Sequence, residues 1–244
     1  MSSFKNKLPI TVLSPTPGVI IWYCQIPMIL QWILNGSKYH HFRPPKNEQF
    51  KQNEFFQPIF SPDEINTLNN FKALKKQVEW ISGRYLIKQM IQHLFLGNAA
   101  LDGITLSTLD EGAPFLTHDP DIPISLSHSN EYTAVACSRN KQQTIGIDLE
   151  KIAKKPDVFF LKTAFTHEEI LNLKDDAAHI LKNWTIKEAY LKYIKRGFNE
   201  SLHKVEVINN DIRHNHKKID LTVYSTFFDG YVLSLVSDPP PHSS

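Results

Sequence analysis

The sequence has little glycine, only two cysteines and no strong charge of either sign. None of its nine glycines lies in a GxGxxG or GxxxxGK[ST] nucleotide-binding pattern. Cys24 and Cys137 lie in apolar runs without CxxC or His/Cys ligand spacing, so we expect two buried free thiols in a reducing cytosol. A formal charge of +2 over 244 residues argues against a dedicated nucleic-acid-binding protein.

The sequence also lacks a long uninterrupted apolar run. The longest, residues 19–34, is broken by Gln25, Pro27 and Gln31 and is shorter than the roughly 20 residues that a membrane helix needs. No small-x-small cleavage site follows the N-terminal lysines. We therefore expect a cytoplasmic protein that does not enter a membrane.

An internal similarity organises the chain. "SPDEI" (61–65) and "THEEI" (166–170) both predict helix starts with a capping box, and each precedes a tryptophan helix, "WISGRYLIK" from Trp80 and "WTIKEAYLK" from Trp184. Aligned on tryptophan, Arg84 takes the place of Glu188. Alternating apolar runs predict strands at 19–26, 104–108, 113–116, 133–138, 144–152, 205–208, 219–224 and 231–236. This order predicts one α+β unit used twice, with a boundary in the polar run 139–144, while 35–59 is predicted as a long loop or irregular insert.

Three carboxylates could hold a metal. In "GIDLE" a strand would place Asp148 and Glu150 on one face, where they repel unless a cation lies between them or water solvates them on an exposed edge. Glu188 lies at the edge of the apolar face of the second tryptophan helix. It could instead form an ordinary pair with Lys192, stabilising the helix by about 0.2–0.5 kcal/mol. Carboxylates with room for phosphate are ligands that Mg²⁺ takes.

A second set of residues could bind phosphate. Ser127, His128 and Ser129 form a polar tip before a strand, although such a tip is often only a turn. Arg84 and Lys88 on the first tryptophan helix could add positive charge, or could lie on a solvated helix face.

Together these motifs resemble a known family. "GIDLE", "FTHEE" and "WTIKEAYLK", preceded by "SGRYLIK", "GAPFL" and "ISLSHS", are similar to the signature of 4′-phosphopantetheinyl transferases, specifically the larger two-lobed type that activates peptide and polyketide synthetases. The resemblance runs from about Ser61 to Lys192. It implies two α+β lobes, 1–140 and 141–244, related by a pseudo-twofold axis, with the active site in the cleft between them.

The resemblance also implies roles for particular residues. Asp148, Glu150 and Glu188 match the acidic Mg²⁺ site, for which Mn²⁺ is an alternative ion. The matches for the coenzyme A side are two lysines near the pyrophosphate, two residues at the 3′-phosphate and basic residues of the first lobe: Lys187 and Lys192, Ser127 and His128, and Arg84 with Lys88. One departure is "TLNNF", where Asn69 and Asn70 stand in place of basic residues.

The implied reaction transfers the phosphopantetheine arm of coenzyme A to a serine of an apo carrier protein and releases adenosine 3′,5′-bisphosphate. Glu188, Lys187, Lys192 and Glu150 would carry the chemistry, and either Glu188, Glu150 or a metal-bound water would take the serine proton. The carrier is expected to dock near 151–162, on a protein that we expect to be a monomer. A catalytically silent carrier-binding module and a Mg²⁺-dependent coenzyme A hydrolase remain alternatives.

Overall fold

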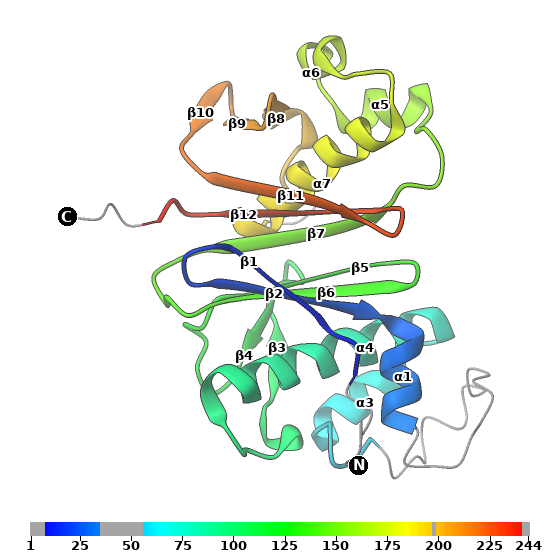
Figure 1. Cartoon of the computed structure of the whole chain (residues 1–244), viewed down its shortest axis with the longest axis vertical. Coiled ribbons are helices and arrows are strands. Elements are labelled where there is room, and N and C mark those ends of the chain that lie inside the picture. The colour runs from blue at the N-terminus through cyan, green and yellow to red at the C-terminus, as the bar shows by residue number, and fades with distance from the viewer. Residues whose placement is uncertain (1–7, 35–55, 197–198, 241–244) are drawn as a thin grey trace, which may run out of the picture.

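A computed structural model describes residues 8–34, 56–196 and 199–240. Most of the predicted insert at 35–59 lies outside these ranges. The fold mixes helices with antiparallel sheets, so the predicted α+β class is confirmed. Figure 1 shows two sheets stacked across the middle of the molecule, with helices covering the outer side of each.

The first sheet and its helices come from the N-terminal part of the chain. Its strand order is β1-β2-β6-β5. The strands of this half, including a separate β3-β4 hairpin, are β1 (Thr11–Thr16), β2 (Val19–Gln25), β3 (Leu106–Thr108), β4 (Pro114–Leu116), β5 (Ile124–Ser129) and β6 (Tyr132–Ser138). Its helical segments are α1 (Ile26–Leu34), α3 (Pro62–Asn70), α4 (Leu74–Ile91), the π-helical η1 (Gln92–Leu96) and the 3₁₀ turn η2 (Leu101–Gly103).

The second sheet has the order β11-β12-β7 and comes from the chain after residue 144. The strands of this half, including the β10-β9-β8 sheet, are β7 (Ile145–Lys151), β8 (Val205–Ile208), β9 (Asp211–His214), β10 (Lys217–Ile219), β11 (Thr222–Phe228) and β12 (Tyr231–Ser237). Its helical segments are α5 (Val158–Ala164), α6 (His167–Asn172), α7 (Ala177–Tyr193) and the 3₁₀ turn η4 (Leu202–Lys204). None of the described helices has the length and apolar character needed to cross a bilayer.

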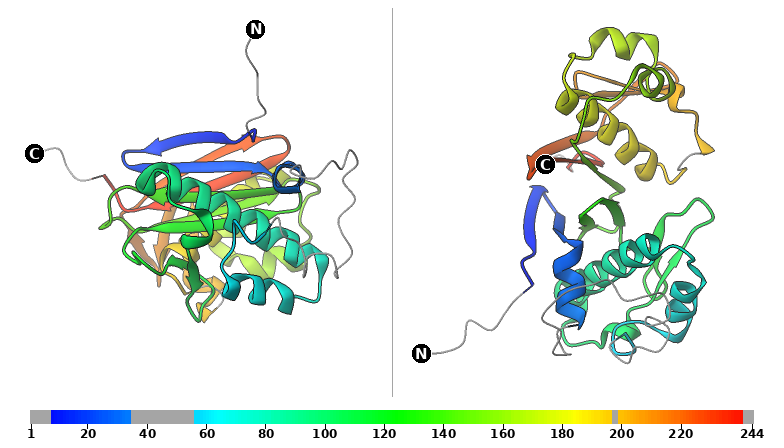
Figure 2. Two further views of the ribbon diagram at one scale, coloured as in Figure 1. Left: turned by 90° about the horizontal axis from the view of Figure 1, so that it is seen from below. Right: turned by 90° about the vertical axis from the view of Figure 1, so that its right-hand side faces the viewer.

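The two sheets bury their facing sides against each other. Ile21 and Ala134 of the first sheet share one apolar cluster with Ile147, Leu149 and Leu233 of the second. Alternation along β7 then turns its other side chains, Asp148 and Glu150 included, toward α7. Seen from the side in Figure 2, each long helix lies on the outer surface of its own sheet. This packing is what places a helix beside the acidic strand.

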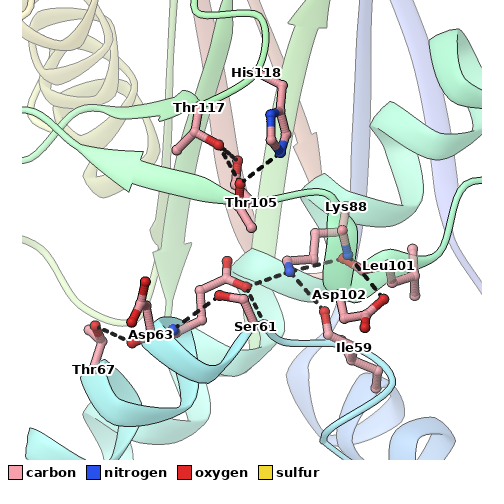
Figure 3. Close-up of polar contacts among 12 residues, drawn as sticks. Ile59, Ser61, Asp63, Thr67, Lys88, Leu101, Asp102, Thr105, Thr117 and His118 are labelled. Carbon is pink, nitrogen blue, oxygen red and sulfur yellow. Dashed lines mark hydrogen bonds and ion pairs between the residues drawn. The ribbon is translucent and has the colours of Figure 1, made fainter.

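Both capping boxes form as the sequence predicts. Ser61 caps α3 by accepting a hydrogen bond from the Glu64 amide, and Thr166 caps α6 by accepting one from Glu169. Each capping glutamate also binds a fully buried lysine, and Glu64 Oε2 is 2.5 Å from Lys88 Nζ. Figure 3 shows Lys88 between Ile59 and Leu101, near Ser61. Glu169 is 2.7 Å from Lys187 Nζ. Desolvation of these two ammonium groups is offset by their paired carboxylates.

The two lysine clusters match in the acceptors around the ammonium group. Lys88 Nζ also donates to the carbonyls of Ile59 and Leu101, and Lys187 Nζ to those of Ala164 and Leu202. Lys88 lies eight positions after Trp80, whereas Lys187 lies three after Trp184. The structural match therefore shifts the alignment of the two helices by five residues. Arg84 is not the counterpart of Glu188, contrary to the alignment on tryptophan.

Two further elements differ from the sequence prediction. Ser127, His128 and Ser129 lie within strand β5 and not in a turn, since β5 pairs with β6 as far as Ser129. The apolar run 19–34 divides between β2 and α1. Cys24 and Cys137 are buried free thiols, as predicted, and burial raises the pKa of Cys24 to about 11 and of Cys137 to about 12.

Candidate active site

The acidic strand β7 runs beside the edge strand β5, and Asp148 lies where the two meet. Asp148 is 5% exposed and its Oδ1 accepts hydrogen bonds from Ser127 Oγ at 2.8 Å and from Lys192 Nζ at 2.7 Å. Its Oδ2 is buried without a partner among the described residues. One half of this carboxylate is thus fixed, and the other is available to a ligand.

Glu150 lies two positions further along β7 and is half-buried. Ser129 Oγ donates to Glu150 Oε2 at 3.0 Å. Burial raises the pKa of Glu150, and the nearby Asp148 charge adds to the rise. The Ser129 hydroxyl, Lys192 and the Trp184 indole oppose it. Trp184 therefore acts on the acidic site directly.

Glu188 approaches the same strand from α7. Burial, then repulsion by Asp148, raises the pKa of Glu188 to about 7, although Lys192 lowers it. Its Oε1 is buried with no hydrogen-bond partner in the described part of the chain. Lys192 forms an ion pair with Asp148, with Nζ 2.7 Å from Oδ1. Glu188 is thus held near two other carboxylates, each of which disfavours its ionised form.

Glycine makes this approach possible. A Cβ on Gly146 would lie 2.0 Å from the Ala189 carbonyl oxygen and 2.5 Å from the Tyr193 amide nitrogen. The backbones of β7 and α7 therefore meet at a separation that only glycine permits. This close crossing carries Glu188, the neighbour of Ala189, to the acidic strand.

These carboxylates fit a hard cation by their chemistry. Two buried oxygens, Asp148 Oδ2 and Glu188 Oε1, have no hydrogen-bond partner among the residues that the structure describes, and the side chains repel one another. A divalent cation would bind the two oxygens and offset the repulsion, and carboxylate oxygens are ligands that Mg²⁺ prefers. Within the described ranges, however, no three His, Cys, Asp or Glu side chains are already arranged as a group that could hold a metal ion.

The structure separates the predicted lysines into two kinds. Lys192 is 29% exposed and points its ammonium at Asp148. Lys88 and Lys187 are fully buried, each held by a glutamate and two carbonyls, and burial lowers the pKa of both. Three hydrogen bonds use all the donors of an ammonium group. The geometry therefore brings Lys192 to the carboxylates but does not bring Lys88 or Lys187.

His128 faces the same region from β5. Its Nδ1 lies 3.7 Å from Glu79 Oε2 on α4, and its side chain is 41% exposed. Burial lowers its pKa, Glu79 opposes that shift, and Lys192 adds to it. The charges of Lys192 and Asp148 both affect the pKa of His128, so the imidazole lies near the acidic group. Ser127, by contrast, already uses its hydroxyl proton on Asp148.

Arg84 lies on α4 under the β3-β4 hairpin. Its Nη2 donates to Thr108 Oγ1 at 2.9 Å and its guanidinium carbon lies 5.4 Å from the centre of the Trp80 ring. Burial lowers its pKa. Its Nη1 is buried without a partner among the described residues. Thr108 and the effect of Trp184 on Glu150 had no signal in the sequence, whereas Ser129 was predicted at a polar tip that could bind phosphate. The alternation of serine at 125, 127 and 129 was the signal that could have placed it on a strand.

The family model and the known proteins that match this chain all indicate the same family. A family model described as the 4′-phosphopantetheinyl transferase superfamily matches residues 144–236. The chain is 31% identical over 194 residues to the 4′-phosphopantetheinyl transferase gsp of Aneurinibacillus migulanus, covering 75% of this chain and 78% of that protein. It is 26% identical over 190 residues to the human L-aminoadipate-semialdehyde dehydrogenase-phosphopantetheinyl transferase, covering 69% of this chain and 59% of the human protein. A 4′-phosphopantetheinyl transferase of Bacillus subtilis is 26% identical over 119 residues, which is 46% of this chain and 50% of that one.

Proposed function

Because the chain belongs to the 4′-phosphopantetheinyl transferase superfamily, we propose that its acidic group on β7 and α7 is the active site of this transfer. The enzyme takes the phosphopantetheine arm from coenzyme A and attaches it to a serine of an apo carrier protein. Adenosine 3′,5′-bisphosphate leaves. The observation that carries the assignment is the pair of buried carboxylate oxygens of Asp148 and Glu188 that have no hydrogen-bond partner in the described part of the chain.

In this proposal Asp148, Glu150 and Glu188 hold Mg²⁺, with Mn²⁺ as an alternative. The ion supplies charge neutralisation on the pyrophosphate of coenzyme A. The carrier serine must attack a phosphorus surrounded by negative charge, so the protein's task is alignment and electrostatic stabilisation. Lys192, which is partly exposed and already reaches Asp148, stabilises the leaving bisphosphate.

The nucleotide end of coenzyme A would extend toward the N-terminal half, residues 1–140, from the catalytic half, 141–244. His128 is exposed on β5 and is assigned to the 3′-phosphate, with Ser127 beside it. Arg84 Nη1 has no partner within the described ranges and is assigned to a phosphate oxygen of coenzyme A. Lys88 and Lys187 are assigned to structural ion pairs and not to the phosphates.

Removal of the serine proton falls to Glu188 or Glu150. Glu150 already accepts a hydrogen bond from Ser129, whereas Glu188 Oε1 accepts none from the described residues. A general base must reach the proton that it removes, and an oxygen without an existing donor can do so without breaking a bond. We therefore assign the base to Glu188.

The function is tested with the purified protein, coenzyme A, Mg²⁺ and an apo carrier protein. Release of adenosine 3′,5′-bisphosphate should require all three additions and should stop in excess chelator. Asp148→Ala should abolish release while circular dichroism and thermal unfolding show a folded protein. Full activity in chelator would refute the metal assignment, and release without a carrier would favour the hydrolase.

The carrier is proposed to dock at residues 151–162, which run from the last residue of β7 into α5. Lys151, Lys154 and Lys155 provide positive charge there, and Lys155 pairs with Asp175. The first turn of α5 then exposes two apolar side chains, Val158 at 65% and Phe159 at 80%. An exposed apolar pair bordered by lysines suits a partner helix with an acidic rim and an apolar centre.

Charge reversal tests this surface. Replacing Lys154 and Lys155 by glutamate should raise KM for the carrier, steeply at low salt, and leave KM for coenzyme A unchanged, because exposed charges mainly alter encounter. The matched control reverses Lys217 and Lys218 on β10, at the opposite end of the C-terminal half in Figure 1. Equal effects of the two reversals would place the docking site elsewhere.

A further inference from the structure

Three serines of β5 connect the two halves of the molecule. Ser125, Ser127 and Ser129 alternate along the strand, and their hydroxyl oxygens accept hydrogen bonds from backbone amides of β7. The pairs are Ile147 N to Ser125 Oγ at 3.0 Å, Leu149 N to Ser127 Oγ at 3.3 Å and Lys151 N to Ser129 Oγ at 3.2 Å. The constant spacing means that β5 and β7 run side by side in register, joined by side chains in place of a backbone ladder.

Each of these hydroxyls has a proton left to donate. A serine oxygen that accepts an amide hydrogen can still donate its own hydrogen elsewhere. Ser127 directs it to Asp148 and Ser129 to Glu150, at 2.8 and 3.0 Å. Ser125 has no such carboxylate, because the residue at the corresponding position of β7 is Gly146. One serine thus only joins the strands, and two also hold acidic side chains.

We propose that Ser129 is a positioning residue that fixes Glu150 in the orientation needed to bind the metal ion. The proposal rests on the proposed function of the acidic group. Ser129 is 8% exposed, so water does not readily replace its hydroxyl. The hydrogen bond that Ser129 Oγ accepts from the Lys151 amide restricts rotation of the hydroxyl. The hydrogen bond that the hydroxyl donates to Glu150 is strong because the acceptor is charged. Ser129 therefore links the joint between the two halves to the metal site.

The chain supplies a matched control for this idea. Ser129→Ala removes both the strand-joining bond and the bond to Glu150, whereas Ser125→Ala removes only a strand-joining bond. Ser129→Thr retains the hydroxyl. Thermal unfolding should show a loss of stability for both alanine variants, because each leaves one amide of β7 without its hydrogen-bond acceptor.

The deciding measurement is Mn²⁺ affinity, followed by electron paramagnetic resonance without coenzyme A or carrier. Ser129→Ala should bind Mn²⁺ about tenfold more weakly or worse, the usual effect of losing a partner that orients a metal ligand. Ser125→Ala should bind as the wild type does, and Ser129→Thr should recover most of the affinity. Equal affinities in both alanine variants, or a wild type that binds no Mn²⁺, would overturn the proposal. Failure of the wild type to modify a carrier while the affinity difference persists would instead refute only the proposed reaction.

Discussion

The close crossing of β7 and α7 makes Gly146→Ala an informative substitution. The added Cβ would lie 2.0 Å from a backbone oxygen, whereas ordinary contact begins at 3.4 Å, so the helix must move by about 1.4 Å. The obstructing atoms belong to the main chain of α7 and cannot rotate away. Overpacking of this kind costs about 1–3 kcal/mol. We expect the upper part of that range.

The same displacement of α7 should also lower kcat. Moving α7 away from β7 carries Glu188 and Lys192 away from Asp148, and a misplacement of about 1 Å can cost about 100-fold in rate. Urea unfolding and kcat for carrier modification measure the two effects. Gly103→Ala is the control, because a Cβ there would meet nothing within 4 Å. A Gly146→Ala protein with wild-type stability and wild-type kcat would refute the packing argument.

Three further predictions concern buried charge. Glu188→Gln keeps the shape of the side chain and removes its charge, so kcat should collapse while calorimetry still detects coenzyme A binding; near-normal turnover would remove Glu188 from the mechanism. In chelator, the unfolding free energy of the wild type relative to Glu188→Gln should fall as pH rises from 4.5 to about 7, because the folded state holds the Glu188 proton more tightly than the unfolded state. Added Mg²⁺ should suppress that fall, and a flat difference would contradict the raised pKa. Lys187→Met leaves Glu169 buried without its cation and should cost about 3–5 kcal/mol in urea unfolding; a small loss of stability with abolished kcat would instead make Lys187 catalytic.

The sequence predicted those features that depend on short-range periodicity. Alternation in "GIDLE" placed Ile147 and Leu149 on the core side of β7 and Asp148 on the other, as the structure has them. The capping boxes at Ser61 and Thr166 followed from local hydrogen-bond chemistry.

The features that could not be predicted from the sequence depend on contacts between distant segments of the chain. From sequence alone, a lysine on a helix is expected to be solvated. Lys88 and Lys187 are instead buried in ion pairs because other segments bring glutamates and carbonyls to them. Ser127 and Ser129 were predicted to lie at a polar tip before a strand, either binding phosphate or only forming a turn, because serine is common in turns. They are instead buried against the amides of β7, a contact between segments that no local pattern reports.

We propose above all that the acidic group on β7 and α7 transfers phosphopantetheine to a carrier protein. The most direct measurement is the intact mass of an apo carrier after incubation with the protein, coenzyme A and Mg²⁺, alongside the same reaction with Asp148→Ala. We expect the carrier to gain one phosphopantetheine on its serine with the wild type and none with the variant. An unmodified carrier accompanied by free phosphopantetheine, or equal modification by both proteins, would contradict this proposal.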